Sequence, residues 1–270
     1  MHLLRKSLFV VLAVPLGLAL AVPRSYAAQT LYQTGFERPI FHDGDLLVGL
    51  DGWTGAVPPP PFSLNPQAAR ITADEASRGS QSVEVHGEDL VASGGNTPPY
   101  DAVGSYRRPL NYTVSPNTVV RMEADLLLDT DQPKTEGEFF SLTVAARSGD
   151  GETLGEIGLS SAGIVEAFGF DVPPGSSPAF TKHLSLNQWH HVTMRLDYAH
   201  RTTAYFIDGH FLGTINTPST SNVLLRGAMV VYARPDGDST GRKNRISTRS
   251  SYTAYFDNFR VSVGQRADDD

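Results

Sequence analysis

The chain has 270 residues, no cysteine and a formal net charge of −7, from 22 basic and 29 acidic residues. The absence of cysteine excludes thiol catalysis, cysteine-based zinc sites and disulfides. An acidic chain is also a poor general binder of nucleic acid, because neutralising phosphates needs a clear basic excess.

Residues 1–27 are typical of a secretory signal peptide. Arg5 and Lys6 precede an apolar stretch over residues 7–22, and small residues up to Ala27 form a cleavage site. The stretch is short for a bilayer span and contains Pro15. We therefore expect cleavage at this point and a secreted protein with no membrane span. Its net charge falls from −7 to −10, because three basic residues are lost.

Residues 28–264 are expected to form one domain, followed by an acidic tail over residues 265–270. Gly (25 residues), Pro (18 residues) and short alternating runs between turn signals predict an all-β, antiparallel two-sheet sandwich. The clearest strand is 119–128, whose even-numbered residues are apolar, whereas Arg121, Glu123 and Asp125 lie on the other face.

A second alternating strand is expected over 190–198, and a hairpin follows. The run 205–207 turns at Asp208-Gly209 into 210–212, since Asp-Gly readily adopts the positive φ angles of a type I′ turn. The Pro-rich stretches 57–61, 97–99 and 172–178 are interpreted as loops. No amphipathic helix is expected.

Several segments resemble known jelly rolls. Residues 187–197, beginning Asn187-Gln188-Trp189-His190-His191, with 201–209 and Leu212-Gly213, resemble the core of laminin-G-like domains. The segments 34–37, 52–53, 78–85 and 255–261 are shared with β-jelly-roll carbohydrate-binding modules. The chain thus resembles the laminin-G-like and concanavalin A-like lectin and glucanase superfamily. This resemblance implies two curved sheets, with ligands on the concave face or at the loop rim.

The same resemblance raises the question of catalysis. Laminarinase-type hydrolases carry Glu-x-Asp-x-(x)-Glu on one strand, and Glu123-Ala124-Asp125 begins such a pattern. The third carboxylate is missing, because residues 127 and 128 are leucine, and Asp129 lies roughly 20 Å from Glu123 along an extended strand. These charges are interpreted as a solvated strand face. We assign no catalytic residue, and His190 and His191 are given packing roles.

Binding candidates are scattered along the chain. Arginine forms bidentate hydrogen bonds with carboxylate or sulfate, which suits an anionic sugar. Tyrosine rings can stack on sugars. The basic segment 234–249 could hold such a sugar at the rim, although a solvated loop is the simpler interpretation. Trp53 and Trp189 are assigned to the core. The candidate ligand-binding residues are Tyr100, Tyr106, Arg147, Arg226, Tyr232 and Arg234.

The leading hypothesis is a secreted, non-catalytic carbohydrate-binding or matrix-associated protein whose partner is a glycan, including anionic ones. The alternative is a polysaccharide-degrading enzyme, either a glycoside hydrolase or a polysaccharide lyase, on the same fold. A lyase would need a base such as His or Tyr and an arginine to neutralise the uronate. The residue types are present, but no lyase motif surrounds them. A structural or protein-interaction role is the third option.

A structural calcium ion is also expected. Asp257 is placed on the apolar face of the final strand with Phe259 and Val261, and a carboxylate there is costly unless it is paired or metal-bound. Related jelly rolls bind calcium between the two chain ends, and the resemblance assigns the ligands here to Asp257, Glu37 and Gly79. The alternative is that Asp257 caps a turn or pairs with an arginine.

Overall fold

A computed structural model describes residues 28–56, 65, 67–92, 102–130, 139–168, 180–217, 219–234 and 252–265. The predicted signal peptide and the Pro-rich stretches 57–61, 97–99 and 172–178 lie outside these residues, as does the tail beyond Gln265. In the described chain, no helix is long and apolar enough to cross a membrane.

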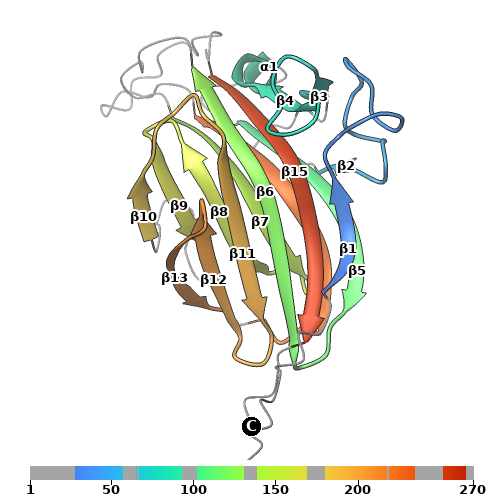
Figure 1. Ribbon diagram of the computed structural model, residues 1–270, viewed down its shortest axis with the longest axis vertical. Helices are drawn as coiled ribbons and strands as arrows, with labels where there is room; N and C mark the ends of the chain where they lie inside the picture. The colour runs from blue at the N-terminus through green and yellow to red at the C-terminus, as the bar shows by residue number, and fades with distance from the viewer. Residues whose placement is uncertain are drawn as a thin grey trace, which may run out of the picture.

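The described residues form two antiparallel sheets packed face to face, which confirms the predicted all-β sandwich (Figure 1). The eight-stranded sheet has the order β13 (His210–Asn216), β12 (Thr202–Ile207), β11 (His190–Asp197), β6 (Thr118–Thr130), β15 (Tyr252–Gln265), β4 (Ser82–His86) and β3 (Ala69–Thr72), and β1 (Gln29–Thr34) also pairs with β15. The seven-stranded sheet has the order β10 (Phe180–His183), β9 (Ile164–Phe168), β8 (Thr153–Ser160), β7 (Phe139–Ser148), β14 (Val223–Arg234), β5 (Ala102–Thr113) and β2 (Thr54–Gly55).

The local signals explain the best-predicted elements. In β6 the apolar residues, such as Met122 and Leu126, face the second sheet because successive side chains point to opposite faces. Asp208 and Gly209 have φ angles of 49° and 77°, and they join β12 to β13 as expected. One short helix, α1 (Gly87–Ala92), was not expected.

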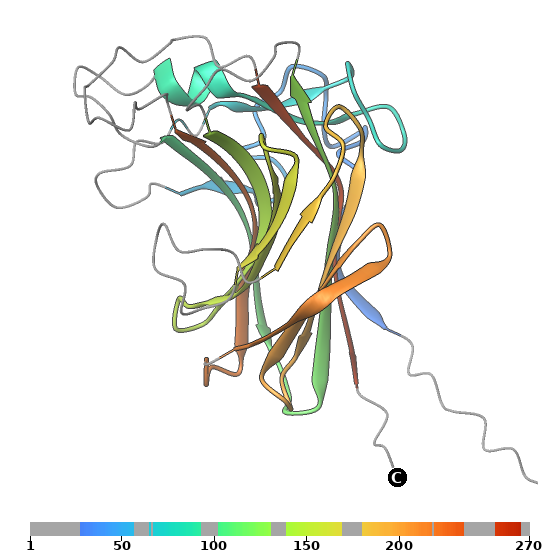
Figure 2. The same ribbon diagram turned by 90° about the vertical axis from the view of Figure 1, so that its left-hand side faces the viewer.

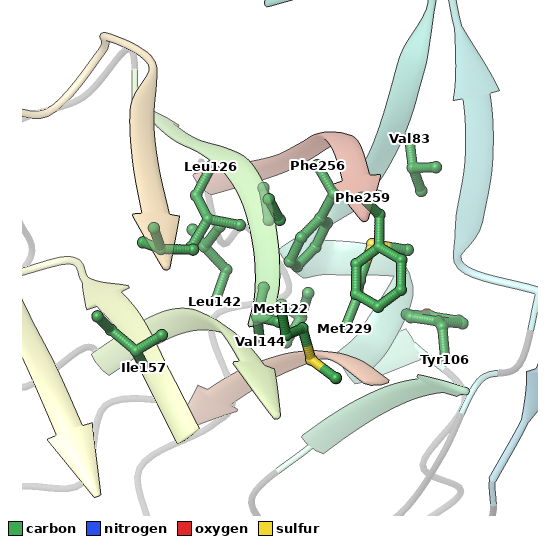
Figure 3. Packing of buried hydrophobic residues seen from close by; sticks show 14 of the residues in the cluster. Val83, Tyr106, Met122, Leu126, Leu142, Val144, Ile157, Met229, Phe256 and Phe259 are labelled. Carbon is green, nitrogen blue, oxygen red and sulfur yellow. The ribbon is translucent and has the colours of Figure 1, made fainter. Parts of the chain in front are cut away.

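The core lies between the two sheets. Phe256 and Phe259 from β15 meet Met229 from β14 and Val144 from β7 there (Figure 3). β15, near the C-terminal end of the chain, lies between β6 and β4 inside its sheet, so segments distant in sequence pair side by side. Each sheet therefore has one face in the core and one outer face on which functional side chains can lie.

Candidate functional site

The outer face of the seven-stranded sheet is concave, as its bowed strands show in Figure 2. Tyr106, Val144, Ile157 and Met229 face the core from four of these strands, so their immediate neighbours in sequence face outward. The strand register aligns those outward residues in rows. One row contains Arg107, Ala228, Ala145 and Glu156, and the next contains Ser105, Val230, Thr143 and Gly158.

Three arginines gather on this concave face. Arg226 on β14 is directly opposite Arg147 on β7, and Arg107 on β5 is opposite Ala228, two residues along β14 from Arg226. All three side chains are half-buried. Arg107 Nε donates to Ser105 Oγ at 3.3 Å, and Arg147 donates to the Thr153 hydroxyl.

Among the described residues, these arginines have no carboxylate partner. Within the described ranges, none of the three forms an ion pair, and the buried Nε of Arg226 has no hydrogen-bond acceptor. Burial and then the charges of Arg226 and Arg147 lower the pKa of Arg107 to about 10, while burial and Arg147 lower the pKa of Arg226. The guanidinium groups stay protonated at neutral pH. The three arginines therefore place a local excess of positive charge on this face, and guanidinium groups of this kind can bind an anion.

Two carboxylates occupy the neighbouring strands of the same face. Glu156 lies on β8 and Glu166 on β9, and Thr143 Oγ1 donates to Glu156 Oε1 at 2.9 Å. Burial raises the pKa of Glu156, although the Thr143 hydrogen bond and the charge of Arg147 oppose it. Burial and then the charge of Glu156 raise the pKa of Glu166. The concave face thus combines arginines that form no ion pair within the described chain with carboxyl groups whose pKa values are raised.

The outer face of the eight-stranded sheet has charges of a different kind. His191 Nδ1 lies 2.6 Å from Asp125 Oδ1, and His191 Nε2 lies 3.3 Å from Glu123 Oε1. Asp125 also accepts hydrogen bonds from Ser77 Oγ and Asn258 Nδ2, and Arg121 pairs with Glu123 at 2.7 Å. The hydrogen bonds with Asp125 and then with Glu123 raise the pKa of His191 to about 9.

The prediction of a solvated strand face for Glu123 and Asp125 was therefore wrong. Asp125 is only 6% exposed, because the loop containing Ser77 and the side chains of His191 and Asn258 cover it. His190 is buried and lies within hydrogen-bonding distance of Asp208 Oδ2 and the Ser185 carbonyl, which agrees with its predicted packing role.

Comparison with solved structures places this architecture among known folds. No protein-family model matches the sequence, and no curated protein matches it. An endo-1,3-β-glucanase from Streptomyces sioyaensis is similar over 95% of this chain and 100% of its own, with a TM-score of 0.59 and 11% identity. A carbohydrate esterase of the Shiga toxin-encoding bacteriophage phi24B is similar over 88% of this chain and 100% of its own, with a TM-score of 0.54 and 12% identity.

A third solved structure, a non-specific endo-β-1,3(4)-glucanase, gives a TM-score of 0.51 at 12% identity over 92% of this chain and 94% of its own. The chain has the concanavalin A-like lectin and glucanase jelly-roll fold. The resemblance found in the sequence is confirmed at the level of the fold.

This jelly roll brings together some of the predicted ligand-binding residues. Arg147 and Arg226 are direct cross-strand neighbours, and Tyr232 lies half-buried on the same face. Tyr100 and the side chain of Arg234 lie outside the described residues. Arg107 was missed, because only its register with β14, more than 100 residues away, places it beside the other two.

Two aromatic assignments were wrong. Tyr106 alternates with Ser105 and Arg107, so its ring faces inward, is fully buried in the core and cannot stack on a sugar (Figure 3). Trp189 is not part of the core but lies half-buried beside Tyr255, with ring centroids 6.4 Å apart. Trp53 is fully buried, as predicted.

The predicted calcium ligands converge in this jelly roll. A methyl group on Gly35 would lie 3.8 Å from Glu37 Cγ and 3.9 Å from Asp257 Oδ1, and one on Gly79 would lie 2.1 Å from Glu37 Oε1. Asp257 follows the core residue Phe256 and is opposite Asp125, so it lies on the outer side of β15, and a bulge at Asn258, with φ of 50°, returns Phe259 to the core. The prediction that Asp257 shares a face with Phe259 and Val261 was therefore wrong.

Hydrogen-bond donors already approach both carboxylates. Asp257 accepts the backbone N–H groups of Ser77, Arg78 and Asn258, and Glu37 accepts three donors from Ser80 and Gln81. Each carboxylate keeps one oxygen with a single donor, which fits one further ligand bond. In the described ranges, no group of three His, Asp or Glu side chains is arranged to hold a metal. A calcium ion here would need backbone carbonyls as well, and it stays a prediction.

A cavity of about 240 Å³ is lined by none of Arg107, Arg147 and Arg226. Its lining includes Asp197 at the end of β11, Tyr198 and Arg201 after β11, and Asn222 before β14. The hydroxyl of Tyr198 is buried without a hydrogen-bond partner. The charged residues that line the cavity are one carboxylate, Asp197, and one cation, Arg201, so it lacks the excess of positive charge of the concave face, which is the stronger candidate site.

Proposed function

We propose that this protein is an extracellular, polysaccharide-directed jelly roll whose concave face binds an acidic glycan. The observation that carries the proposal is the group of Arg107, Arg147 and Arg226, which have no acidic partner in the described chain although the protein as a whole is acidic. Unpaired buried charge is costly, so such a group is retained where a ligand completes it.

The chemistry of arginine selects the ligand class. A guanidinium offers a planar fork of donors that matches carboxylate or sulfate, and three forks on adjacent strands lie close enough to contact neighbouring units of one polymer. Strands lie about 4.8 Å apart. The net negative charge of the protein makes broad attraction to anions a poor explanation, so binding would depend on the local group of three arginines.

The named structural neighbours support a carbohydrate partner. The three compared above are two glucanases and a carbohydrate esterase. An anionic rather than a neutral polymer is favoured for this chain by the arginines alone. Secretion, which would bring the protein to such a polymer, is supported by the sequence of residues 1–27.

Binding to immobilised polymers tests the proposal. The protein should bind an acidic polysaccharide such as polygalacturonate or alginate more tightly than neutral laminarin, and the affinity should fall as salt is added. Arg226→Gln should weaken binding at least about tenfold, because a hydrogen bond to a charged group contributes roughly 1.5–3 kcal/mol.

Arg195→Gln provides the matched control, since Arg195 is exposed on β11 of the other sheet. It should leave the affinity unchanged. Equal binding of acidic and neutral polymers, or full binding by the Arg147→Gln/Arg226→Gln double variant, would contradict the proposal.

A further inference from the structure

Glu156 and Glu166 form a carboxylate pair beside the arginines. Glu166 is directly opposite Gly158, and Glu156 is two residues before Gly158 on the same strand. The two glutamates are therefore diagonal neighbours across β8 and β9, a relation that places side-chain origins about 7–8 Å apart or slightly less. Because Gly158 has no side chain, no group from β8 stands between them.

Among the described residues, no cation contacts this pair directly. In the part of the chain that the structure describes, neither glutamate forms an ion pair, and Thr143 Oγ1 donates to Glu156 at 2.9 Å. Burial raises the pKa of both groups, and the charge of one raises that of the other. Burial thus favours the protonated form of each carboxyl group, and ionising Glu156 makes ionising Glu166 more costly.

The arginines set where a polymer would lie relative to this pair. Glu156 is opposite Ala145 on β7, and Arg147 is two residues further along that strand, so Arg147 and Glu156 are also diagonal neighbours. In a uronate the carboxylate is attached to the sugar ring itself. An acidic sugar held by Arg147 and Arg226 would therefore have its glycosidic linkage within reach of β8 and β9.

We propose that Glu156 and Glu166 act as general acid and general base in hydrolysing a glycosidic bond of the acidic polysaccharide bound by the arginines. This inference rests on the proposed function. It makes the protein an enzyme and assigns residues to the reaction.

The reaction balances with water as the only co-reactant. Protonated Glu156 gives its proton to the glycosidic oxygen as the bond from the anomeric carbon to that oxygen breaks. Glu166 takes a proton from water, whose oxygen bonds to the anomeric carbon. Glu156 ends ionised and Glu166 ends protonated, and exchange of protons with solvent restores the starting state. Glu166 is assigned to water because β9 lies nearer the sheet edge than β8.

The experiment measures cleavage and binding on the same polymers. Wild type, Glu156→Gln and Glu166→Gln are incubated with polygalacturonate, alginate and polyglucuronate, and new reducing ends are counted. The ultraviolet absorbance of unsaturated uronate is followed in the same samples. Glu84→Gln, on β4 of the opposite sheet, is the matched control.

Wild type and Glu84→Gln should release reducing ends without unsaturated product. Each glutamine variant at Glu156 or Glu166 should lower the rate at least about 100-fold, while binding stays within about twofold and the melting temperature is unchanged. Absence of cleavage on a polymer that the protein binds, unsaturated product, or full activity in the glutamine variants would overturn this inference and leave the proposed binding function intact. Failure of the wild type to bind any acidic polymer would instead reject the proposed function.

Discussion

Both outer faces of the sandwich contain a group of charged side chains, but the group on one face is paired and the group on the other is not paired within the described chain. On the eight-stranded sheet, His191 lies between Glu123 and Asp125, and Asp125 accepts further hydrogen bonds from Ser77 and Asn258. On the seven-stranded sheet, arginines and glutamates face outward without direct partners of opposite charge in the described chain.

Under the proposed function, this difference separates charges that stabilise the fold from charges that bind a ligand. A network whose donors and acceptors are all satisfied rigidifies its surroundings. An unsatisfied group of like charges costs stability, and it is expected where binding repays that cost. Changes on the eight-stranded face should therefore affect folding, and changes on the concave face should affect binding.

The largest expected effect on stability comes from Asp125→Ala. It removes the acceptor for His191, Ser77 and Asn258 at once, and Asp125 itself is only 6% exposed. We expect a loss of about 3 kcal/mol in the free energy of unfolding, reduced from the value for a fully buried pair because His191 is 40% exposed. Denaturant titration measures it.

Asp129→Ala, on the same strand β6 but half-buried, provides the control and should change stability by less than about 0.5 kcal/mol. Affinity for acidic polysaccharide should be unchanged in both variants. A large loss of affinity in Asp125→Ala would contradict the hypothesis that the eight-stranded face serves stability and the concave face serves binding.

Removal of calcium is expected to have the next largest effect on stability. It tests whether Asp257 and Glu37 are satisfied by protein hydrogen bonds alone or also by a metal ion. If an ion joins Asp257 and Glu37, saturation at 100 times its dissociation constant stabilises the fold by about 2.7 kcal/mol. EDTA should then lower the melting temperature by roughly 5–10 °C in a domain of this size.

Asp257→Ala should make the melting temperature insensitive to EDTA. Burial raises the pKa of Asp257 to about 6, so the experiment belongs above that pH, where the carboxylate is ionised. An unchanged wild-type melting curve with EDTA, and no metal by elemental analysis, would show that no calcium is bound and that the backbone N–H groups alone stabilise the Asp257 carboxylate.

A smaller effect is expected from pH. The pKa of His191 is about 9 in the folded protein, raised from 6.5 first by the hydrogen bond with Asp125 and then by that with Glu123. Its contribution is therefore full below pH 6.5 and is lost as the pH rises through 9. Because His191 is 40% exposed, we expect this loss to be about 1 kcal/mol.

The free energy of unfolding measured from about pH 7 to 10 should thus decline in wild type and decline less in His191→Gln. Asp257 is ionised throughout this range and adds no slope. Parallel pH curves for the two proteins would show that the His191 network does not stabilise the fold. The pKa values of Glu123 and Asp125 are lowered, so their contribution is lost only toward acid pH.

The sequence predicted the features that depend on neighbouring residues alone. The alternation in β6 and the Asp208-Gly209 turn follow from side-chain period and backbone freedom, and both appear as expected. The motif around Trp189 and His190 identified the fold. The bulge at Asn258 was not foreseeable from alternation, because one extra residue reverses which face the following residues occupy.

The candidate site depended on pairing between distant segments. Arg107 and Arg108 are adjacent in sequence, but Arg108 faces inward, 4.3 Å from the centre of the Tyr32 ring, whereas Arg107 faces outward. The Arg147–Arg226 pair spans 79 positions and appears only when β7 and β14 are set in register. Glu156 and Glu166 were not singled out, since each is an ordinary charged residue in a short strand until the sheet places the two together.

The smallest change in stability, and the sharpest test of the comparison, comes from Arg107→Gln. Its guanidinium donates one hydrogen bond, to Ser105, and is repelled by Arg226 and Arg147, which contribute with burial to its lowered pKa. Removing the charge relieves that repulsion, so the free energy of unfolding should change by less than about 0.5 kcal/mol. Affinity for acidic polysaccharide should nevertheless fall about tenfold, because one charged contact is lost.

Denaturant titration and binding measured on the same preparation check both parts. Arg107→Lys separates charge from shape: lysine keeps the cation but not the planar fork, so it should recover only part of the affinity. A marked loss of stability in Arg107→Gln would mean that this arginine supports the fold as the His191 network does. The contrast between the two faces, stabilising charges on one and ligand-binding charges on the other, would then not hold.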